Sequence, residues 1–183
     1  MERRTILIVG DSLSAGYGLE KNQSWVTLLQ DRLMSKGYDY KVVNASISGD
    51  TTTGGVQRLP RALETHQPYI VLIELGGNDG LRGTPISTIR NNLENMILLS
   101  QKKGAKVVLA GMVIPPNYGA EYTNQFADTY PKLAETYNTA LIKFFLEGMA
   151  LDRSLFQPDQ IHPTAEAQPI LLNNVWQVMK PLL

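Results

Sequence analysis

Ser12 stands in a sequence context suited to nucleophilic chemistry. It lies in Gly10-Asp11-Ser12-Leu13-Ser14, directly after the apolar run at residues 5–9. If that run is a parallel strand, the turn after it faces the edge of the sheet where ligands bind. A serine hydroxyl is a weak nucleophile at neutral pH and needs a base within hydrogen-bond reach. In isolation, the same segment also fits an ordinary turn.

The two histidines of the chain are the candidate bases. His66 stands at the end of a predicted helix and before a predicted strand, so we interpret it as an ordinary surface residue on the other side of the sheet. His162 follows Asp159 by three positions in a segment that precedes the last predicted helix. In that arrangement Asp159 can orient the imidazole while His162 accepts the proton of Ser12. The alternative is that Asp159 is a turn residue and His162 a helix-entry residue.

Acyl transfer also needs hydrogen-bond donors aimed at the developing oxyanion. Gly49 has no side chain to block approach to its backbone N–H, and Asn78 brings a side-chain amide. With the backbone N–H of Ser12, these residues form a candidate oxyanion hole. As an alternative, Asn78 and Asp79 cap the helix that follows them.

The elements that position these residues follow an alternating pattern. Short runs rich in Val, Ile and Leu alternate with longer amphipathic segments, as in a parallel sheet covered by helices on both faces. We expect strands at residues 5–9, 40–44, 69–75, 106–112 and 140–144. We expect helices at residues 24–36, 53–64, 86–103, 124–137 and 164–179, and a loop at residues 113–122. The predicted fold is a single-domain, three-layer α/β/α sandwich over residues 1–183, with a flavodoxin-like five-stranded parallel sheet.

This arrangement gathers the candidate residues at one edge. The loops at residues 10–14, 46–51, 76–80 and 113–122 all follow the carboxyl ends of predicted strands. Those ends meet at one edge of a parallel sheet. The conjunction favours a Ser-His-Asp site more strongly than any single motif does.

Composition limits the other classes of function. Seventeen basic residues balance seventeen acidic ones, so we expect no nucleic-acid partner. With no cysteine and only two histidines, we expect no metal centre built on thiolates or imidazoles. No apolar run approaches the roughly 20 residues of a membrane-spanning helix. The polar start at residues 1–4 leaves no room for a signal peptide, so export is not expected unless a mature start has been trimmed.

The candidate segments resemble the four signature blocks of the SGNH (GDSL-type) hydrolase superfamily, in family order. Residues 10–14 resemble the first block, Gly49 the second, residues 76–79 the third, and Asp159 with His162 the last. Residues 44–51 and 74–83 resemble the bacterial thioesterase I, protease I and lysophospholipase L1 group. The sequence departs from that pattern at Gln160, where relatives usually carry glycine, and glutamine would be strained there if the position needs a positive φ.

The resemblance implies a cofactor-free serine hydrolase that cleaves esters, acyl thioesters or lysophospholipids, using Ser12, His162 and Asp159. It implies a periplasmic or secreted location, with the cytoplasm as the alternative, and a monomer is favoured. An acyl chain could lie in a groove formed by the loop at residues 113–122 and Leu81. The candidate substrate-binding residues are Asp11, Leu81, Ile114, Pro115 and Tyr118.

Two rival functions remain at this point. A carbohydrate O-acetyl esterase would use the same fold and triad but prefer acetylated sugars. A non-catalytic flavodoxin-like module would instead bind phosphate with Ser12, Ser14 and Gly16, and would have no use for Asp159 and His162. For the residues around the predicted groove, simple loop packing is the alternative.

Overall fold

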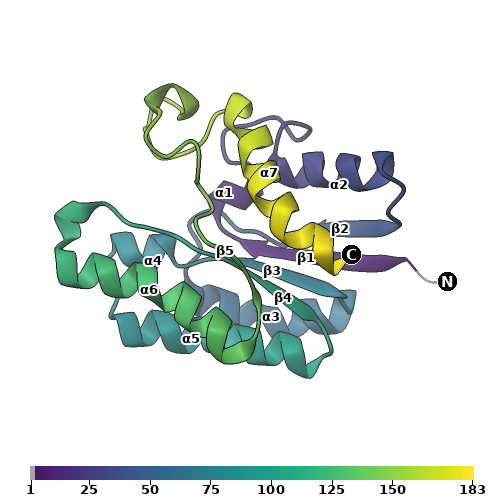
Figure 1. Cartoon of the computed structure of the whole chain (residues 1–183), viewed down its shortest axis with the longest axis horizontal. Helices are drawn as coiled ribbons and strands as arrows, with labels where there is room; N and C mark the ends of the chain where they lie inside the picture. The colour runs from purple at the N-terminus through teal and green to yellow at the C-terminus, as the bar shows by residue number, and fades with distance from the viewer. Residues whose placement is uncertain (1–2) are drawn as a thin grey trace.

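The computed structural model describes residues 3–183, and in that range the chain forms one five-stranded parallel sheet between two layers of helices (Figure 1). The strands are β1 (Arg4–Gly10), β2 (Tyr40–Asn44), β3 (Ile70–Glu74), β4 (Lys106–Ala110) and β5 (Ala140–Ile142). Their order across the sheet is β2-β1-β3-β4-β5, and every neighbouring pair is parallel. The flavodoxin-like fold predicted from the sequence is therefore confirmed.

The strands lie where continuous apolar runs were predicted, because both faces of the sheet are covered. Ile6 to Val9 of β1 and Ile70 to Ile73 of β3 are fully buried. A strand buried on both faces has no polar alternation, which is why these runs read as unbroken hydrophobic segments. The sheet thus supplies the centre of the core.

The longer helices cover the two faces of the sheet. In Figure 1, α2 and α7 lie on one face and α3, α5 and α6 on the other. The bounds are α1 (Ser12–Ala15), α2 (Trp25–Ser35), α3 (Thr52–His66), α4 (Gly77–Leu81), α5 (Ile86–Lys102), α6 (Ala120–Tyr137) and α7 (Gln168–Met179). Short 3₁₀ segments are η1 (Pro116–Tyr118), η2 (Arg153–Leu155), η3 (Ala165–Ala167) and η4 (Lys180–Leu182).

Several predicted bounds were wrong. The predicted loop at 113–122 contains η1, and α6 begins at Ala120 rather than at 124, because Gly119, at φ +93°, ends the irregular stretch. The last helix begins at Gln168 rather than at 164, with η3 before it. The one-turn helices α1 and α4 were not predicted, since so few residues carry no helical periodicity.

The register of the sheet brings the ends of β1 and β3 together. Gly10 pairs with Glu74, the last residue of each strand. The strand order reverses between these two strands, because the chain moves from β1 out to β2 and then back to β3. Ligands bind at such switch points in open α/β sheets. The turns after Gly10 and Glu74 are therefore at the position where a site is expected.

Candidate active site

The turn after β1 places Ser12 at the first position of α1. Asp11 caps this helix, because its side-chain oxygen accepts a hydrogen bond from the N–H of Leu13 at 3.0 Å. The helix ends at once at Gly16, which is left-handed at φ +78°. Gly10 cannot be replaced freely, since a Cβ there would lie 2.7 Å from Glu74 Oε1. The segment thus holds Ser12 partly exposed at the edge of the sheet.

The segment before α7 brings an imidazole to this serine. His162 Nε2 lies 3.0 Å from Ser12 Oγ, across 150 positions of sequence. On the other side of the ring, Nδ1 lies 2.6 Å from Asp159 Oδ2. The spatial convergence on which the sequence prediction depended is present.

Asp159 is fixed by its own loop. Its Oδ1 accepts hydrogen bonds from the backbone N–H groups of Ile161 at 2.9 Å and His162 at 3.0 Å. The hydrogen bond with the His162 ring and these two backbone bonds lower the pKa of Asp159 to about 2. The carboxylate is therefore ionised at neutral pH and can stabilise an imidazolium.

Gln160 has a positive φ of +59° in this loop. The left-handed conformation suspected at this position is thus present, and a residue with a Cβ is strained in it. The loop accommodates Gln160 because its backbone N–H donates to the carbonyl of Gln157 at 2.8 Å. The substitution of the usual glycine has not moved His162 away from Ser12.

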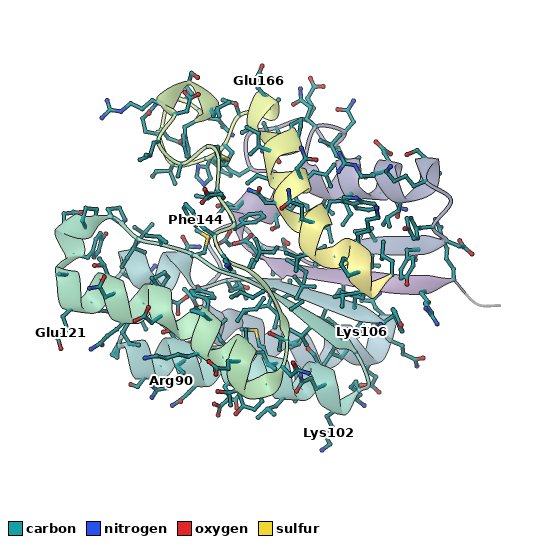
Figure 2. All side chains as sticks on the ribbon, viewed as in Figure 1. Arg90, Lys102, Lys106, Glu121, Phe144 and Glu166 are labelled. Atoms are coloured by element: carbon teal, nitrogen blue, oxygen red, sulfur yellow. The ribbon has the colours of Figure 1, made fainter. Side chains whose placement is uncertain are left out.

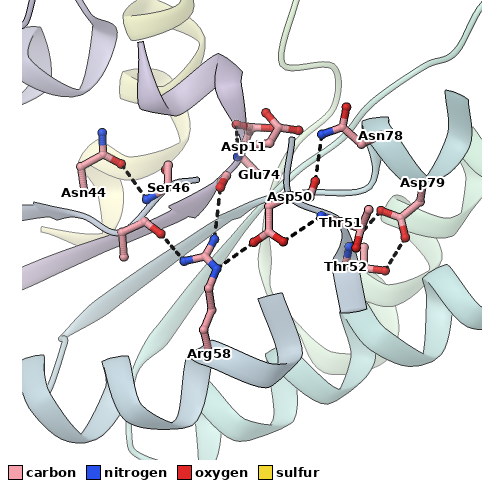
Figure 3. A network of polar contacts seen from close by, with 12 residues as sticks. Asp11, Asn44, Ser46, Asp50, Thr51, Thr52, Arg58, Glu74, Asn78 and Asp79 are labelled. Carbon is pink, nitrogen blue, oxygen red and sulfur yellow. Dashed lines mark hydrogen bonds and ion pairs between the residues drawn. The ribbon is translucent and has the colours of Figure 1, made fainter. Parts of the chain in front are cut away.

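The three candidate oxyanion donors come from three strand ends. Within residues 3–183, the backbone N–H groups of Ser12 and Gly49 donate to no other group. Gly49 has φ +81° in a turn closed by a hydrogen bond from the Asp50 N–H to the Ile47 carbonyl at 3.1 Å. Asn78 donates one amide hydrogen to the Asp50 carbonyl at 2.8 Å (Figure 3), which leaves the other hydrogen available.

Comparison with known proteins decides which family carries this arrangement. Residues 8–169 match the GDSL-like Lipase/Acylhydrolase family. Esterase TesA of Pseudomonas aeruginosa is 52% identical over 180 residues, which are 98% of this chain and 90% of that protein. Thioesterase 1/protease 1/lysophospholipase L1 of Escherichia coli K12 is 42% identical over 98% of this chain and 85% of that protein. A crystal structure of TesA matches with a TM-score of 0.95 at 52% identity, covering 98% of this chain and 100% of that one.

The chain belongs to the GDSL-like lipase/acylhydrolase family. The family recognised from the four sequence blocks is thereby confirmed, as is the SGNH hydrolase fold.

This acylhydrolase has an apolar cavity of about 610 Å³ beside Ser12. Four of the five predicted substrate-binding residues line it: Asp11, Leu81, Ile114 and Pro115. Tyr118 does not line it, and its hydroxyl donates to the Leu81 carbonyl at 2.8 Å. A groove beside Ser12 is thus present, and Tyr118 is bonded to one of its lining residues, Leu81.

The opposite wall of the cavity was not predicted. It is formed by the segment between β5 and α7, which also carries Asp159 and His162. Figure 2 shows Phe144 at the start of this segment, where the chain leaves β5. The apolar lining residues that were not predicted are Leu13, Met112, Phe144, Leu146, Ala150, Leu151, Phe156 and Ile161. Hydropathy alone cannot reveal this wall, because its residues are scattered over irregular structure.

A pair of buried carboxyl groups lies under the nucleophile turn. Asp11 and Glu74 are 3% and 0% exposed. Glu74 Oε1 accepts a hydrogen bond from the hydroxyl of Ser14 at 2.6 Å. Burial, followed by the nearby charge of Asp11, raises the pKa of Glu74 well above its usual range, and burial raises the pKa of Asp11 to about 6. Glu74 therefore holds its proton to a higher pH than an ordinary glutamate does. Ser14 is bonded inward and cannot bind phosphate as the rival flavodoxin-like function required.

His66 is the last residue of α3 and lies at the amino end of β3, away from Ser12, as interpreted from the sequence. Among residues 3–183, no group of three or more His, Asp or Glu side chains is placed to bind a metal ion. In the same part of the chain, the helices are too short or too polar to cross a membrane.

Proposed function

We propose that the protein is a serine hydrolase that cleaves carboxylic esters and acyl thioesters through an acyl-enzyme on Ser12. One observation carries the proposal: His162 joins Ser12 Oγ at 3.0 Å to Asp159 Oδ2 at 2.6 Å through its two ring nitrogens. The names of the two relatives, an esterase and a thioesterase, support the same reaction class.

Acylation begins when the Ser12 hydroxyl attacks the acyl carbonyl. The hydroxyl proton passes to His162 Nε2, while Nδ1–H stays hydrogen bonded to Asp159. The carbonyl oxygen becomes an oxyanion that accepts hydrogen bonds from the N–H groups of Ser12 and Gly49 and from the free amide hydrogen of Asn78. The imidazolium then protonates the departing alcohol or thiol as its bond to carbon breaks.

Deacylation repeats these steps with water as the nucleophile. His162 removes a proton from the water molecule as its oxygen attacks the acyl-Ser12 carbonyl. Collapse of the second tetrahedral intermediate breaks the bond to Ser12 Oγ, which regains its proton from His162. The products are a carboxylic acid and the free enzyme, and no cofactor takes part in these steps.

The apolar cavity supports a hydrophobic acyl chain as the group bound next to the reacting carbonyl. Its walls carry aliphatic and aromatic side chains such as Leu81, Ile114 and Phe144. Burial of an acyl chain against them is favourable by about 0.8 kcal/mol per CH₂ group. A lysophospholipid, a long-chain ester and an acyl thioester all offer such a chain. An acetylated sugar would leave its hydroxyl groups facing this apolar lining, so the cavity disfavours the O-acetyl esterase.

Labelling with an alkyl fluorophosphonate tests the nucleophile. Ser12 should be phosphonylated and recovered as the modified residue by peptide mapping. Ser12→Ala should fold normally, resist labelling and lose nearly all turnover of p-nitrophenyl esters. Near-normal hydrolysis by Ser12→Ala would refute the proposal, as would labelling of another serine.

A series of p-nitrophenyl esters from acetyl to palmitoyl tests the acyl cavity. We expect kcat/KM to rise with chain length until the cavity is filled, and then to level off or fall. Ile114→Trp should shorten the optimum, because Ile114 is 4% exposed and lines the cavity. A flat profile in the wild type, or a preference for acetylated sugars, would contradict an acyl-binding role.

A further inference from the structure

Arg58 of α3 contacts the loops that follow two different strands (Figure 3). Its Nε donates to Asp50 Oδ2 at 2.7 Å, and its Nη2 donates to the Gly10 carbonyl at 3.2 Å. Its Nη1 donates to the Ala45 carbonyl. The guanidinium thus joins the turn after β1 to both ends of the loop after β2.

Each contacted segment leads to a candidate oxyanion donor. Gly10 lies two positions before Ser12, and Asp50 directly follows Gly49. The backbone carbonyl of Asp50 accepts the amide of Asn78 at 2.8 Å. The position of all three donors therefore depends on segments that a single side chain holds together.

The local structure is built around the ion pair of Arg58 with Asp50. The side chains are 22% and 12% exposed, so solvent screens the pair only in part. Asp50 Oδ1 also accepts the N–H of Thr51 at 2.9 Å. Gly54 makes room for this carboxylate, because a Cβ at Gly54 would lie 1.9 Å from Asp50 Oδ1. Gly54, Asp50 and Arg58 therefore form one structural unit.

We propose that Arg58 is the positioning residue of the oxyanion hole, an inference that rests on the proposed hydrolase function. Arg58 bonds to none of the three triad side chains; it holds the backbone of the loops that carry the donors. The planar guanidinium is required here, because its N–H groups point in different directions, to one carboxylate and two carbonyls. Lysine has a single ammonium group and cannot reach all three acceptors.

Loss of this positioning should slow the chemical steps more than it weakens substrate binding. Oxyanion stabilisation acts mainly on the tetrahedral intermediates, whereas the acyl cavity binds the ground state as well. Removal of one oxyanion donor typically costs about 100- to 1000-fold in kcat. Because Arg58 acts on the donors indirectly, we expect a smaller loss, of about 10- to 100-fold.

The test compares Arg58→Lys, Arg58→Ala and Gly54→Ala with Arg61→Ala. Arg61 is exposed on the same helix and serves as the matched control. Gly54→Ala displaces the Asp50 carboxylate without altering Arg58. The measurements are kcat and KM for p-nitrophenyl butyrate, the pH profile of kcat/KM, the thermal unfolding midpoint and the affinity for an alkyl trifluoromethyl ketone, which forms a tetrahedral adduct with the serine.

We expect kcat to fall about 10- to 100-fold in Arg58→Lys, Arg58→Ala and Gly54→Ala, with KM within about twofold of the wild type. The affinity for the ketone should fall by a similar factor, while the pH profile keeps its shape because the triad is intact. Arg61→Ala should match the wild type. Assays are run below the lowest unfolding midpoint, so that loss of fold does not imitate loss of rate.

Unchanged kcat in Arg58→Lys and Gly54→Ala would overturn the inference. A fall in kcat without weaker ketone binding would overturn it too, since the defect would then lie outside the oxyanion hole. These results are distinguishable from a failure of the proposed function. In that case the wild type itself would hydrolyse no ester and Ser12 would resist the fluorophosphonate.

Discussion

The phenol ring of Tyr17 lies against the imidazole of His162, with ring centroids 4.3 Å apart and planes tilted by 36°. Tyr17 follows α1, so the segment that carries Ser12 also contacts the imidazole of His162. That imidazole in turn lies within hydrogen-bond distance of Ser12. Tyr17 is 52% exposed and nevertheless has a defined partner. An aromatic face next to an imidazolium is favourable by about 0.5–1 kcal/mol at an exposed site.

The first prediction concerns this ring. Tyr17→Ala should lower kcat about two- to fivefold, because the imidazolium formed during catalysis loses an aromatic neighbour. Tyr17→Phe keeps the ring and should retain nearly full activity. Steady-state assays with p-nitrophenyl butyrate check both variants. Equal losses in the two would assign the effect to the hydroxyl and contradict the stacking role.

The second prediction concerns Gln157, which ties the His162 segment to the Ser12 segment. Its Nε2 donates to the carbonyls of Tyr17 at 2.8 Å and Pro163 at 2.9 Å. Its backbone N–H donates to the His162 carbonyl at 2.7 Å. Gln157→Glu removes both side-chain donors at constant size, so kcat should fall about tenfold, because small displacements of a base are costly.

Two further variants make this result specific. Gly18→Ala should reproduce the loss, because a Cβ there would lie 2.1 Å from Gln157 Oε1 and displace the amide. Gln57→Ala, at an exposed position of α3, is the matched control and should behave as the wild type. The rate of fluorophosphonate labelling is the second readout. An unaltered labelling rate in Gln157→Glu would contradict a role in aligning His162 with Ser12.

The third prediction concerns strain at Gln160. Gln160→Gly should raise the free energy of unfolding by about 0.5–1 kcal/mol, because relief of the left-handed strain exceeds the extra entropy of glycine in the unfolded chain. Gln160→Ala keeps a Cβ and should give no such gain. Gln67→Gly is a matched comparison, since Gln67 has φ +44° at the end of α3. Urea unfolding gives the free energy of unfolding of all three variants. A lower free energy of unfolding in Gln160→Gly alone would contradict strain at this position.

The fourth prediction concerns pH and the buried Glu74. Its folded pKa lies well above the ordinary value of 4.5, so the folded state keeps a proton that the unfolded chain releases. Stability of the wild type should therefore fall as the pH rises from about 4.5 through the raised pKa. Glu74→Gln has no proton to lose at this position and should be more stable than the wild type at pH 8, with a smaller difference at pH 5.

Thermal unfolding at a series of pH values checks this difference. Ser14→Ala is the companion variant, because it removes the hydrogen bond to Glu74 Oε1 but leaves the carboxyl group in place. The stability of Ser14→Ala should still fall as the pH rises, as that of the wild type does. A decline that persists unchanged in Glu74→Gln would mean that Glu74 is not its source.

The central strands and the proximity of Ser12, His162 and Asp159 could be predicted from the sequence because each has a local signal. β1 and β3 are continuous apolar runs, and Ser12, Asp159 and His162 occupy short motifs beside predicted element ends. Parallel topology then brings those ends to one edge. The prediction needed no knowledge of individual contacts.

The supporting residues could not be predicted in this way, because their roles depend on contacts between distant segments. Arg58 stands on an amphipathic helix and has no local feature that distinguishes it from the exposed Arg61. Glu74 is the last residue of an apolar strand, and only the fold reveals that Ser14 meets its carboxyl group. Tyr118 was assigned to the groove for its aromatic ring, but it is not among the lining residues and its hydroxyl bonds to the Leu81 carbonyl.

The stretch of chain between β5 and α7 forms one wall of the apolar cavity and also carries His162. A change of length in that stretch, made to admit a bulkier lipid, would also alter how far the imidazole reaches toward Ser12. On that side of the cavity, a change in acyl-chain selectivity would therefore also change turnover. Leu81 and Ile114, on the facing side, belong to elements that transfer no proton, so chain-length preference can be adjusted there with the proton relay left undisturbed.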